Sequence, residues 1–188
     1  MKSWTQMALA LGLAVSVTAC AADDRTAEDT TAGRDTGAAV GTTGVGMGER
    51  NFIEEHVKLN EAELAIGRLA QERATNAQVK EFAQTMVRDH EAAGRELRQI
   101  ATQHNVEIDA GDMADDHRDL RERMMERQGM EFDREFMDWA VDKHEEAVDD
   151  VEDQVDSENP ALRNWATKTL PTLRKHLDLA RNIQQSLK

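Results

Sequence analysis

Residues 76–97 read NAQVKEFAQTMVRDHEAAGREL, and this run clearly predicts its own structure. It opens with an asparagine, a residue that caps helices, and then repeats apolar residues every three or four positions, which is the period of an α-helix. At 100° per residue, one face collects Phe82, Met86, Ala93 and Leu97. His90 stands in the middle of that face, where polar side chains are normally excluded. The run therefore predicts an amphipathic helix that directs one histidine into a core.

Three other runs repeat this pattern, and each carries one polar side chain in the middle of its apolar face. These side chains are Glu63, His144 and His176. Their apolar neighbours at helical spacing are Phe52, Leu59, Ile66 and Ala70 around Glu63, Phe136, Ala140, Ala147 and Val151 around His144, and Leu162, Leu173, Ala180 and Ile183 around His176. Four helices are thus expected to point four residues of metal-ligand type at one shared core.

The region 49–188 is expected to form one all-α domain. It shows no strand-like alternation, and its prolines are Pro160 and Pro171. The expected helices span about 49–73, 76–104, 112–128, 130–155 and 159–187. Asn76 and Asn159 are expected as caps, with Pro160 at the first helical position of the last helix.

The connections between these helices predict the topology. Short turns join the first two helices and the last two, so each pair is expected to form an antiparallel hairpin. The helix 112–128 stands between the hairpins, is roughly 24 Å long, and can carry the chain back along the bundle. The expected fold is a ferritin-like four-helix bundle, ordered up-down-down-up, with a helical crossover between the second and third long helices.

The four polar residues should meet near the middle of this bundle. Glu63 and His90 each lie about 20 Å from the turn of the first hairpin, and His144 and His176 lie about 22 to 25 Å from the turn of the second. Imidazole and carboxylate groups bind Zn, Cu and Fe, so the four residues form a candidate site for one transition-metal ion. Asp89, next to His90, could orient a ligand histidine through a hydrogen bond.

Two other interpretations use the same residues. The histidines and the glutamate could satisfy one another as a hydrogen-bonded ion network that fixes helix register, without any metal. They could also transfer protons in a reaction, so whether the protein is an enzyme stays open. A carboxylate-bridged di-iron centre is not expected, because Val87 and Leu173 stand where that pattern needs glutamates, three residues before His90 and His176. His56, two turns before Glu63, either extends the cluster or faces solvent.

The first residues predict the location of the protein. Lys2 precedes an apolar run over 7–17, which is too short to span a bilayer and is typical of a secretory signal peptide, residues 1–19. Cys20 is the single cysteine, and Val17-Thr18-Ala19-Cys20 resembles the bacterial lipobox. Residues 20–48 are then expected to be a lipidated cysteine and a tether rich in Ala, Gly, Thr and Asp. The alternative is an ordinary signal peptide with an incidental cysteine. The expected partner is a membrane, reached through the lipid, and the expected location is the periplasmic face of the outer membrane.

The charge of the chain excludes one class of partner. With 23 Lys and Arg against 37 Asp and Glu, the formal net charge is −14. Nucleic acid is therefore not an expected partner. The chain also shows no nucleophile constellation with serine or cysteine and no phosphate-binding glycine loop, so phosphoryl transfer has no support.

Motifs along residues 50–185 resemble a known family. The first half carries Glu63, Leu69-Ala70, Val79-Lys80-Glu81-Phe82-Ala83-Gln84, Met86-Val87 and Asp89-His90, and the second half carries Phe132-Asp133, His144, Leu170-Pro171, Leu173 and His176-Leu177. Taken together these motifs are similar to the family called domain of unknown function 4142. The resemblance implies a secreted or outer-membrane-associated bacterial protein with a ferritin-like bundle, and it implies no particular activity. The rival to metal binding is therefore a non-enzymatic envelope or stress-related interaction module with a purely structural polar core.

Overall fold

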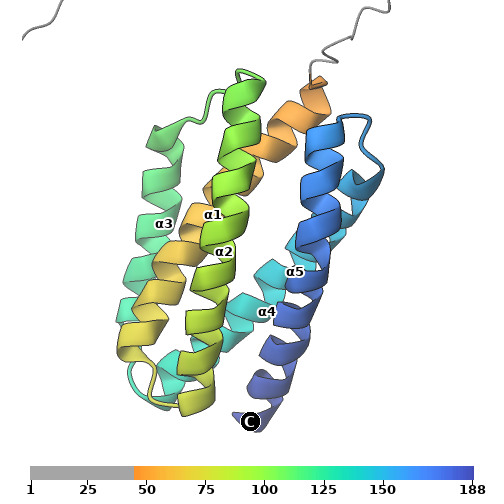
Figure 1. The fold of residues 1–188 in the computed structure, drawn as a ribbon. Coiled ribbons are helices and arrows are strands. Elements are labelled where there is room, and N and C mark those ends of the chain that lie inside the picture. Colours follow the sequence, from red (N-terminus) through yellow and green to blue (C-terminus); the bar gives the residue numbers. More distant parts are fainter. Residues whose placement is uncertain (1–44) are drawn as a thin grey trace, which may run out of the picture. The chain divides into compact units, whose positions relative to one another are not determined.

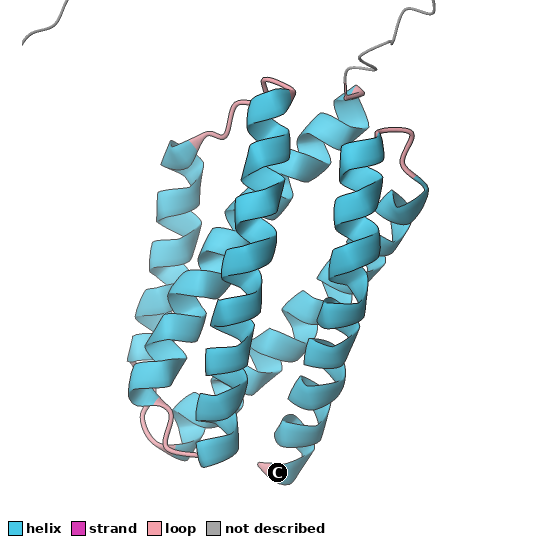
Figure 2. Ribbon diagram, viewed as in Figure 1, coloured by secondary structure: helices cyan, strands magenta, loops and turns pink. Residues whose placement is uncertain are grey.

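The computed structural model describes residues 45–188, and within 110–117 it describes the backbone alone. Five α-helices and one short 3-10 helix make up this part of the chain, in the order α1 (Met47–Arg73), α2 (Ala77–Gln103), α3 (Ala110–Met125), α4 (Met130–Asp153), η1 (Gln154–Asp156) and α5 (Pro160–Ser186). Residues 45–188 contain no strand, which confirms the all-α prediction (Figure 2). The predicted signal peptide, Cys20 and the tether up to residue 44 lie outside the described residues.

The helix starts follow the capping residues that the sequence predicts. The Asn76 side chain accepts hydrogen bonds from the backbone N–H groups of Gln78, at 2.8 Å, and Val79, at 3.3 Å. Asn159 does the same for the first turn of α5, where Pro160 occupies the first position. Each asparagine thereby satisfies N–H groups that have no partner inside their own helix.

The third helix is displaced from its predicted bounds. It runs over Ala110–Met125 rather than 112–128. The prediction was wrong at the end of this helix because the chain must turn before α4, and it turns at Gly129 with a φ of 58°. Such a backbone conformation suits glycine, which has no Cβ to clash. The helix therefore stops short of this turn.

The long helices pack as two hairpins. α1 packs mainly on α2, and α4 packs mainly on α5. α2 also contacts α5, and α3 lies along α1. In Figure 1, α1 and α5 descend while α2 and α4 rise, and α3, at the left edge of the view, carries the chain down from the end of α2 to the start of α4. The core between these helices is built from large apolar side chains, with Ile53, Ile66, Met86, Phe132 and Phe136 fully buried. None of the described helices is long and apolar enough to cross a membrane.

A buried carboxylate holds the α1–α2 turn against the first turn of α4. Asp133 is fully buried and accepts hydrogen bonds from the backbone N–H of Thr75 at 2.9 Å, from its hydroxyl at 2.6 Å and from the N–H of Asn76 at 2.8 Å. A charged acceptor makes such hydrogen bonds shorter and stronger than neutral ones. Asp133 therefore joins the first hairpin to the second and helps to fix the position of α4 along the bundle relative to α1 and α2.

Candidate metal centre

The four polar residues come together inside the bundle. Glu63 extends from α1, His90 from α2, His144 from α4 and His176 from α5, each from near the middle of its helix. Their exposed fractions are 2%, 5%, 0% and 0%. Buried polar side chains at these levels need partners, because taking them out of water is costly. The hydrogen bonds of the four residues therefore show which of their polar atoms are satisfied and which are left for a ligand.

The three histidine rings form a nearly equilateral triangle. Ring centroids are 5.5 Å apart for His90 and His144, 5.5 Å for His90 and His176, and 5.3 Å for His144 and His176. One ring nitrogen from each residue lies within 4.8 Å of the other two. Three imidazoles around one zinc ion, with Zn–N bonds of about 2.1 Å, would place their centroids about 5.2 Å apart. The rings thus stand at the separation that one shared ion requires, and closer approach of the nitrogens needs ring rotation.

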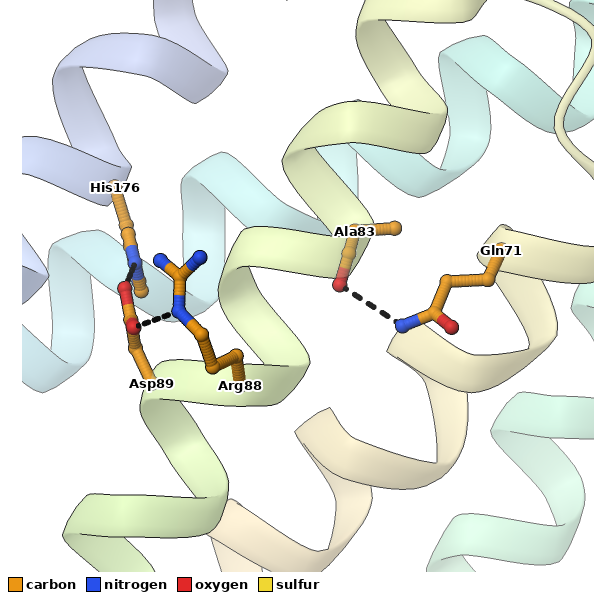
Figure 3. Close-up of polar contacts among 5 residues, drawn as sticks. All are labelled: Gln71, Ala83, Arg88, Asp89 and His176. Atoms are coloured by element: carbon orange, nitrogen blue, oxygen red, sulfur yellow. Dashed lines mark hydrogen bonds and ion pairs between the residues drawn. The ribbon is translucent and has the colours of Figure 1, made fainter.

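Each ring has one nitrogen in contact with an oxygen of the surrounding helices. His90 Nδ1 lies 2.8 Å from Glu63 Oε2, and His144 Nδ1 lies 2.8 Å from the carbonyl oxygen of Ala140. His176 Nε2 lies 3.1 Å from Asp89 Oδ2, a contact visible in Figure 3. A carbonyl or carboxylate oxygen can only accept, so these nitrogens carry the hydrogens.

The other nitrogen of each ring has no hydrogen-bond partner. These nitrogens are Nε2 of His90, Nε2 of His144 and Nδ1 of His176, and all three are buried. In a neutral imidazole that donates from one nitrogen, the second nitrogen bears a lone pair. Metal-binding histidines show this division, with one nitrogen on the ion and the other donating to a carboxylate or a carbonyl. The cluster therefore has the hydrogen-bond pattern of a three-histidine metal site.

The histidines of the cluster differ in the direction of their pKa shifts. Burial lowers the pKa of His176 to about 4, assisted by the nearby His144 and His90, and burial also lowers the pKa of His144. Burial acts on His90 in the same direction, but the charge of Glu63 and the hydrogen bond between them outweigh it and raise the pKa of His90. Burial alone would raise the pKa of Glu63, but the charge of His90 and the same hydrogen bond lower it. At neutral pH His144 and His176 are neutral, as a metal requires.

Glu63 and Asp89 occupy distinct places around the rings. Glu63, predicted from the sequence as a ligand, accepts a hydrogen bond from His90 through Oε2, while its Oε1 has no hydrogen-bond partner and lies 4.0 Å from His144 Nδ1. Asp89, expected to orient a histidine, contacts His176 across the α2–α5 interface rather than its neighbour His90. It also accepts from Arg88 at 2.9 Å, and that arginine lies beside it in Figure 3.

A nearby hydrogen bond keeps α1 and α2 in register below the cluster. Gln71 Nε2 donates to the carbonyl oxygen of Ala83 at 3.4 Å, as Figure 3 shows. Gly67 lets the two helices approach closely here, because a Cβ at this position would lie 2.6 Å from Met86 Cε and 2.8 Å from Val87 Cγ2. This close packing sets the position of His90 relative to Glu63.

Two further polar residues of α1 lie on the same buried face. His56 is buried, stacks on Phe52 with ring centroids 3.9 Å apart, and contacts the Phe52 carbonyl through Nδ1 at 3.2 Å. Asn60 is also buried, and it is not among the site residues predicted from the sequence. The sequence could have predicted its position, because Asn60 lies four residues after His56 and three before Glu63, on the same face of a helix.

The fold and the site define an all-helical protein with a buried cluster of three histidines. The chain belongs to the family described as "Domain of unknown function (DUF4142)", whose model matches residues 35–183. This match confirms the resemblance seen in the sequence motifs. Neither the comparison with curated proteins nor the comparison with solved structures finds a match.

Proposed function

We propose that this protein binds one transition-metal ion through His90, His144 and His176. The observation that carries the proposal is the set of three buried ring nitrogens that lack partners and lie on neighbouring rings. Glu63, Asp89 and the Ala140 carbonyl then orient the rings by accepting their other N–H groups. Such outer partners fix the tautomer of a ligand histidine and raise its basicity.

The rival interpretation, a purely structural polar network, accounts for only part of the cluster. An ion pair between Glu63 and His90 satisfies one nitrogen of His90 and one oxygen of Glu63. It leaves Nε2 of His144 and Nδ1 of His176 unpartnered in the core, and such groups are costly. A metal ion would engage both nitrogens together with Nε2 of His90, so the hydrogen-bond inventory favours metal binding.

Three neutral nitrogen ligands suit Zn, Cu or Fe and leave a coordination position open. A di-iron carboxylate centre has no support, because Glu63 and Asp89 contact histidine N–H groups rather than each other. The directions of α1, α2, α4 and α5 support the ferritin-like up-down-down-up arrangement with α3 as the crossover. This arrangement would build the ion site from four facing helices, as in other bundles with metal sites.

We also propose that the bundle is attached to the periplasmic face of the outer membrane through a lipid on Cys20. Support comes from the apolar run after Lys2 and from the small residues that precede the cysteine. Incorporation of labelled palmitate into the wild-type chain, and its loss in Cys20→Ser, tests the lipid attachment. A wild-type chain that takes up no label would contradict it.

Metal-dependent thermal stability tests the metal proposal. A ligand that binds only the folded protein raises the melting temperature as its concentration rises. We expect Zn²⁺ or Cu²⁺ at micromolar concentration to stabilise the wild-type protein and the control variant His104→Gln, and to leave His144→Gln unchanged. Equal stabilisation of all three proteins would place the ion elsewhere, and stabilisation of none would support the structural interpretation.

A further inference from the structure

A cavity lies beside the histidine cluster, bordered by residues of α1, α2, α4 and α5. Its volume is about 40 Å³, and it meets the cluster at Glu63, His90 and His176. A cavity needs roughly 10 to 15 Å³ for each water-sized occupant, so this one has room for a molecule of about three non-hydrogen atoms. Its walls are mainly apolar, with Leu97 and Trp165 among them.

Three buried polar residues of α1 line this cavity, and each has one side-chain atom without a hydrogen-bond partner. These atoms are Nε2 of His56, Nδ2 of Asn60 and Oε1 of Glu63. The residues are 8%, 7% and 2% exposed. Asp150 Oδ2 is the nearest charged group to His56 Nε2, at 3.6 Å, which is beyond hydrogen-bond distance. Gly94 makes room for the Asn60 amide, because a Cβ at that position would clash with it.

These atoms specify a complementary ligand. The Asn60 amide nitrogen donates and the Glu63 oxygen accepts, while His56, whose Nδ1 contacts a carbonyl, offers a lone pair at Nε2. A matching molecule therefore needs an acceptor for Asn60 and donors for Glu63 and His56. The Glu63 carboxylate disfavours an anion, and the apolar walls make the desolvation of any ion costly.

A second hollow lies next to this cavity, at the surface. A surface groove of about 150 Å³ between α2 and α5 shares Asp89, Ala93, Thr169 and Thr172 with the cavity wall. Thr169 and Thr172 are half-buried, and the Asp89 side chain is 28% exposed. A small molecule could thus reach the polar atoms of α1 by passing between these side chains.

We propose that this cavity is a binding pocket for a small neutral molecule of two to four non-hydrogen atoms that both donates and accepts hydrogen bonds, as a simple amide or a peroxide does. Asn60 and Glu63 are its recognition groups, and the groove between α2 and α5 is its entrance. The inference goes beyond the metal proposal and does not depend on it. An occupant would lie beside His90 and His176, next to any ion that they bind.

Formamide is a suitable probe, because its carbonyl matches Asn60 and its amide group matches Glu63. Three non-hydrogen atoms set a limit of about 0.5 mM on the dissociation constant, so a titration to about 100 mM is appropriate. The full chain is labelled with ¹⁵N, freed of metal with a chelator and followed by NMR. Trp165 lines the cavity and donates its indole N–H to the Ala93 carbonyl at 3.0 Å, whereas Trp139 does not line it.

We expect the Trp165 indole signal, assigned with Trp165→Phe, to shift with saturation while the Trp139 signal stays in place. A linear shift of equal size on both signals would show a solvent effect, and that result would overturn the proposal. Because the titration uses metal-free protein, its outcome is independent of whether the histidines bind an ion.

Matched variants test the cavity and the recognition group. Ala93 lines both the cavity and the groove, and Ala92 lines only the groove. We expect Ala93→Leu to weaken formamide binding at least tenfold, because its larger side chain fills part of the cavity. Ala92→Leu changes only the groove, so it should leave the dissociation constant unchanged. Asn60→Ala keeps the space but removes the amide donor, so it should also weaken binding about tenfold. Formamide binding of wild-type affinity in both Ala93→Leu and Asn60→Ala would overturn the assignment.

Discussion

The metal-free protein should lose stability as the pH falls from 6.5 to 4.5, and His176 should account for much of the loss. Burial lowers the pKa of His176 to about 4 in the folded protein, whereas an unfolded histidine titrates near 6.5. Within this window His176 binds a proton in the unfolded chain and stays neutral in the folded chain. Acid therefore favours the unfolded state, and stability rises as the pH rises.

The size of the effect follows from the shift in pKa. A difference of about 2.5 pH units between the two states is worth roughly 3.4 kcal/mol when the whole titration is covered. Between pH 6.5 and 4.5 about 2 kcal/mol of this is realised, since both titrations extend beyond the window. His144 adds a loss in the same direction, because burial lowers its pKa as well. His90 acts oppositely and mainly above pH 6.5, because its folded pKa is raised by Glu63 despite burial.

Urea unfolding at a series of pH values, with a chelator present, measures this dependence. We expect His176→Gln to show about 2 kcal/mol less loss than the wild type between pH 6.5 and 4.5, whatever its stability at neutral pH. His104→Gln changes a half-buried histidine outside the cluster and serves as the control. Identical pH dependence in the wild type and His176→Gln would refute the reasoning about the buried, neutral state of His176.

Three more predictions concern the partners of the cluster and the frame around it. Glu63→Gln should lower metal affinity about 10- to 100-fold, because Glu63 orients His90 through a 2.8 Å contact. In calorimetric titrations the exposed control Glu55→Gln should bind as the wild type does, and an unchanged Glu63→Gln would argue against this role. Metal binding at pH 6.5 should release protons, because the raised pKa of His90 keeps more of this residue protonated there than a free histidine, and its Nε2 must lose its hydrogen to bind an ion. Binding enthalpies measured in two buffers of different ionisation enthalpy should differ accordingly, and equal enthalpies would contradict a protonated His90. Asp133→Ala should lower the free energy of unfolding by about 3 kcal/mol, because it leaves two N–H groups and a hydroxyl without their charged acceptor. Urea unfolding measures this loss beside that of the exposed control Asp142→Ala. An equal loss in the two variants would show that the hydrogen bonds of Asp133 contribute little to stability.

Periodicity predicts the helices and the depth of the cluster well. Residues with a 3.6-residue repeat share a face, so Glu63, His90, His144 and His176 could be placed toward the core from the sequence alone. Capping asparagines marked where α2 and α5 begin. The least accurate bounds were those of α3, where the position of the turn depends on the left-handed backbone at Gly129.

The hydrogen bonds of the cluster could not be predicted in the same way. Helical spacing places a side chain on a face, but side-chain rotamers decide which nitrogen a histidine presents and which oxygen faces it. For this reason the sequence could not show that Glu63 faces His90 Nδ1, or that Asp89 reaches across to His176 on α5. The cavity at Asn60 depends on the opposing Gly94, a pairing that only the packing of α1 on α2 reveals.

The metal content of the protein tests the central claim most directly. The full chain is purified without chelator and without affinity-tag histidines, and its metals are measured by elemental mass spectrometry beside the triple variant His90→Gln, His144→Gln and His176→Gln. We expect close to one transition-metal ion per chain in the wild type, retained in His104→Gln and lost in a triple variant that circular dichroism shows to be helical. Wild-type protein that is free of metal and does not respond to added Zn, Cu or Fe would contradict the claim, as would metal retained in the triple variant.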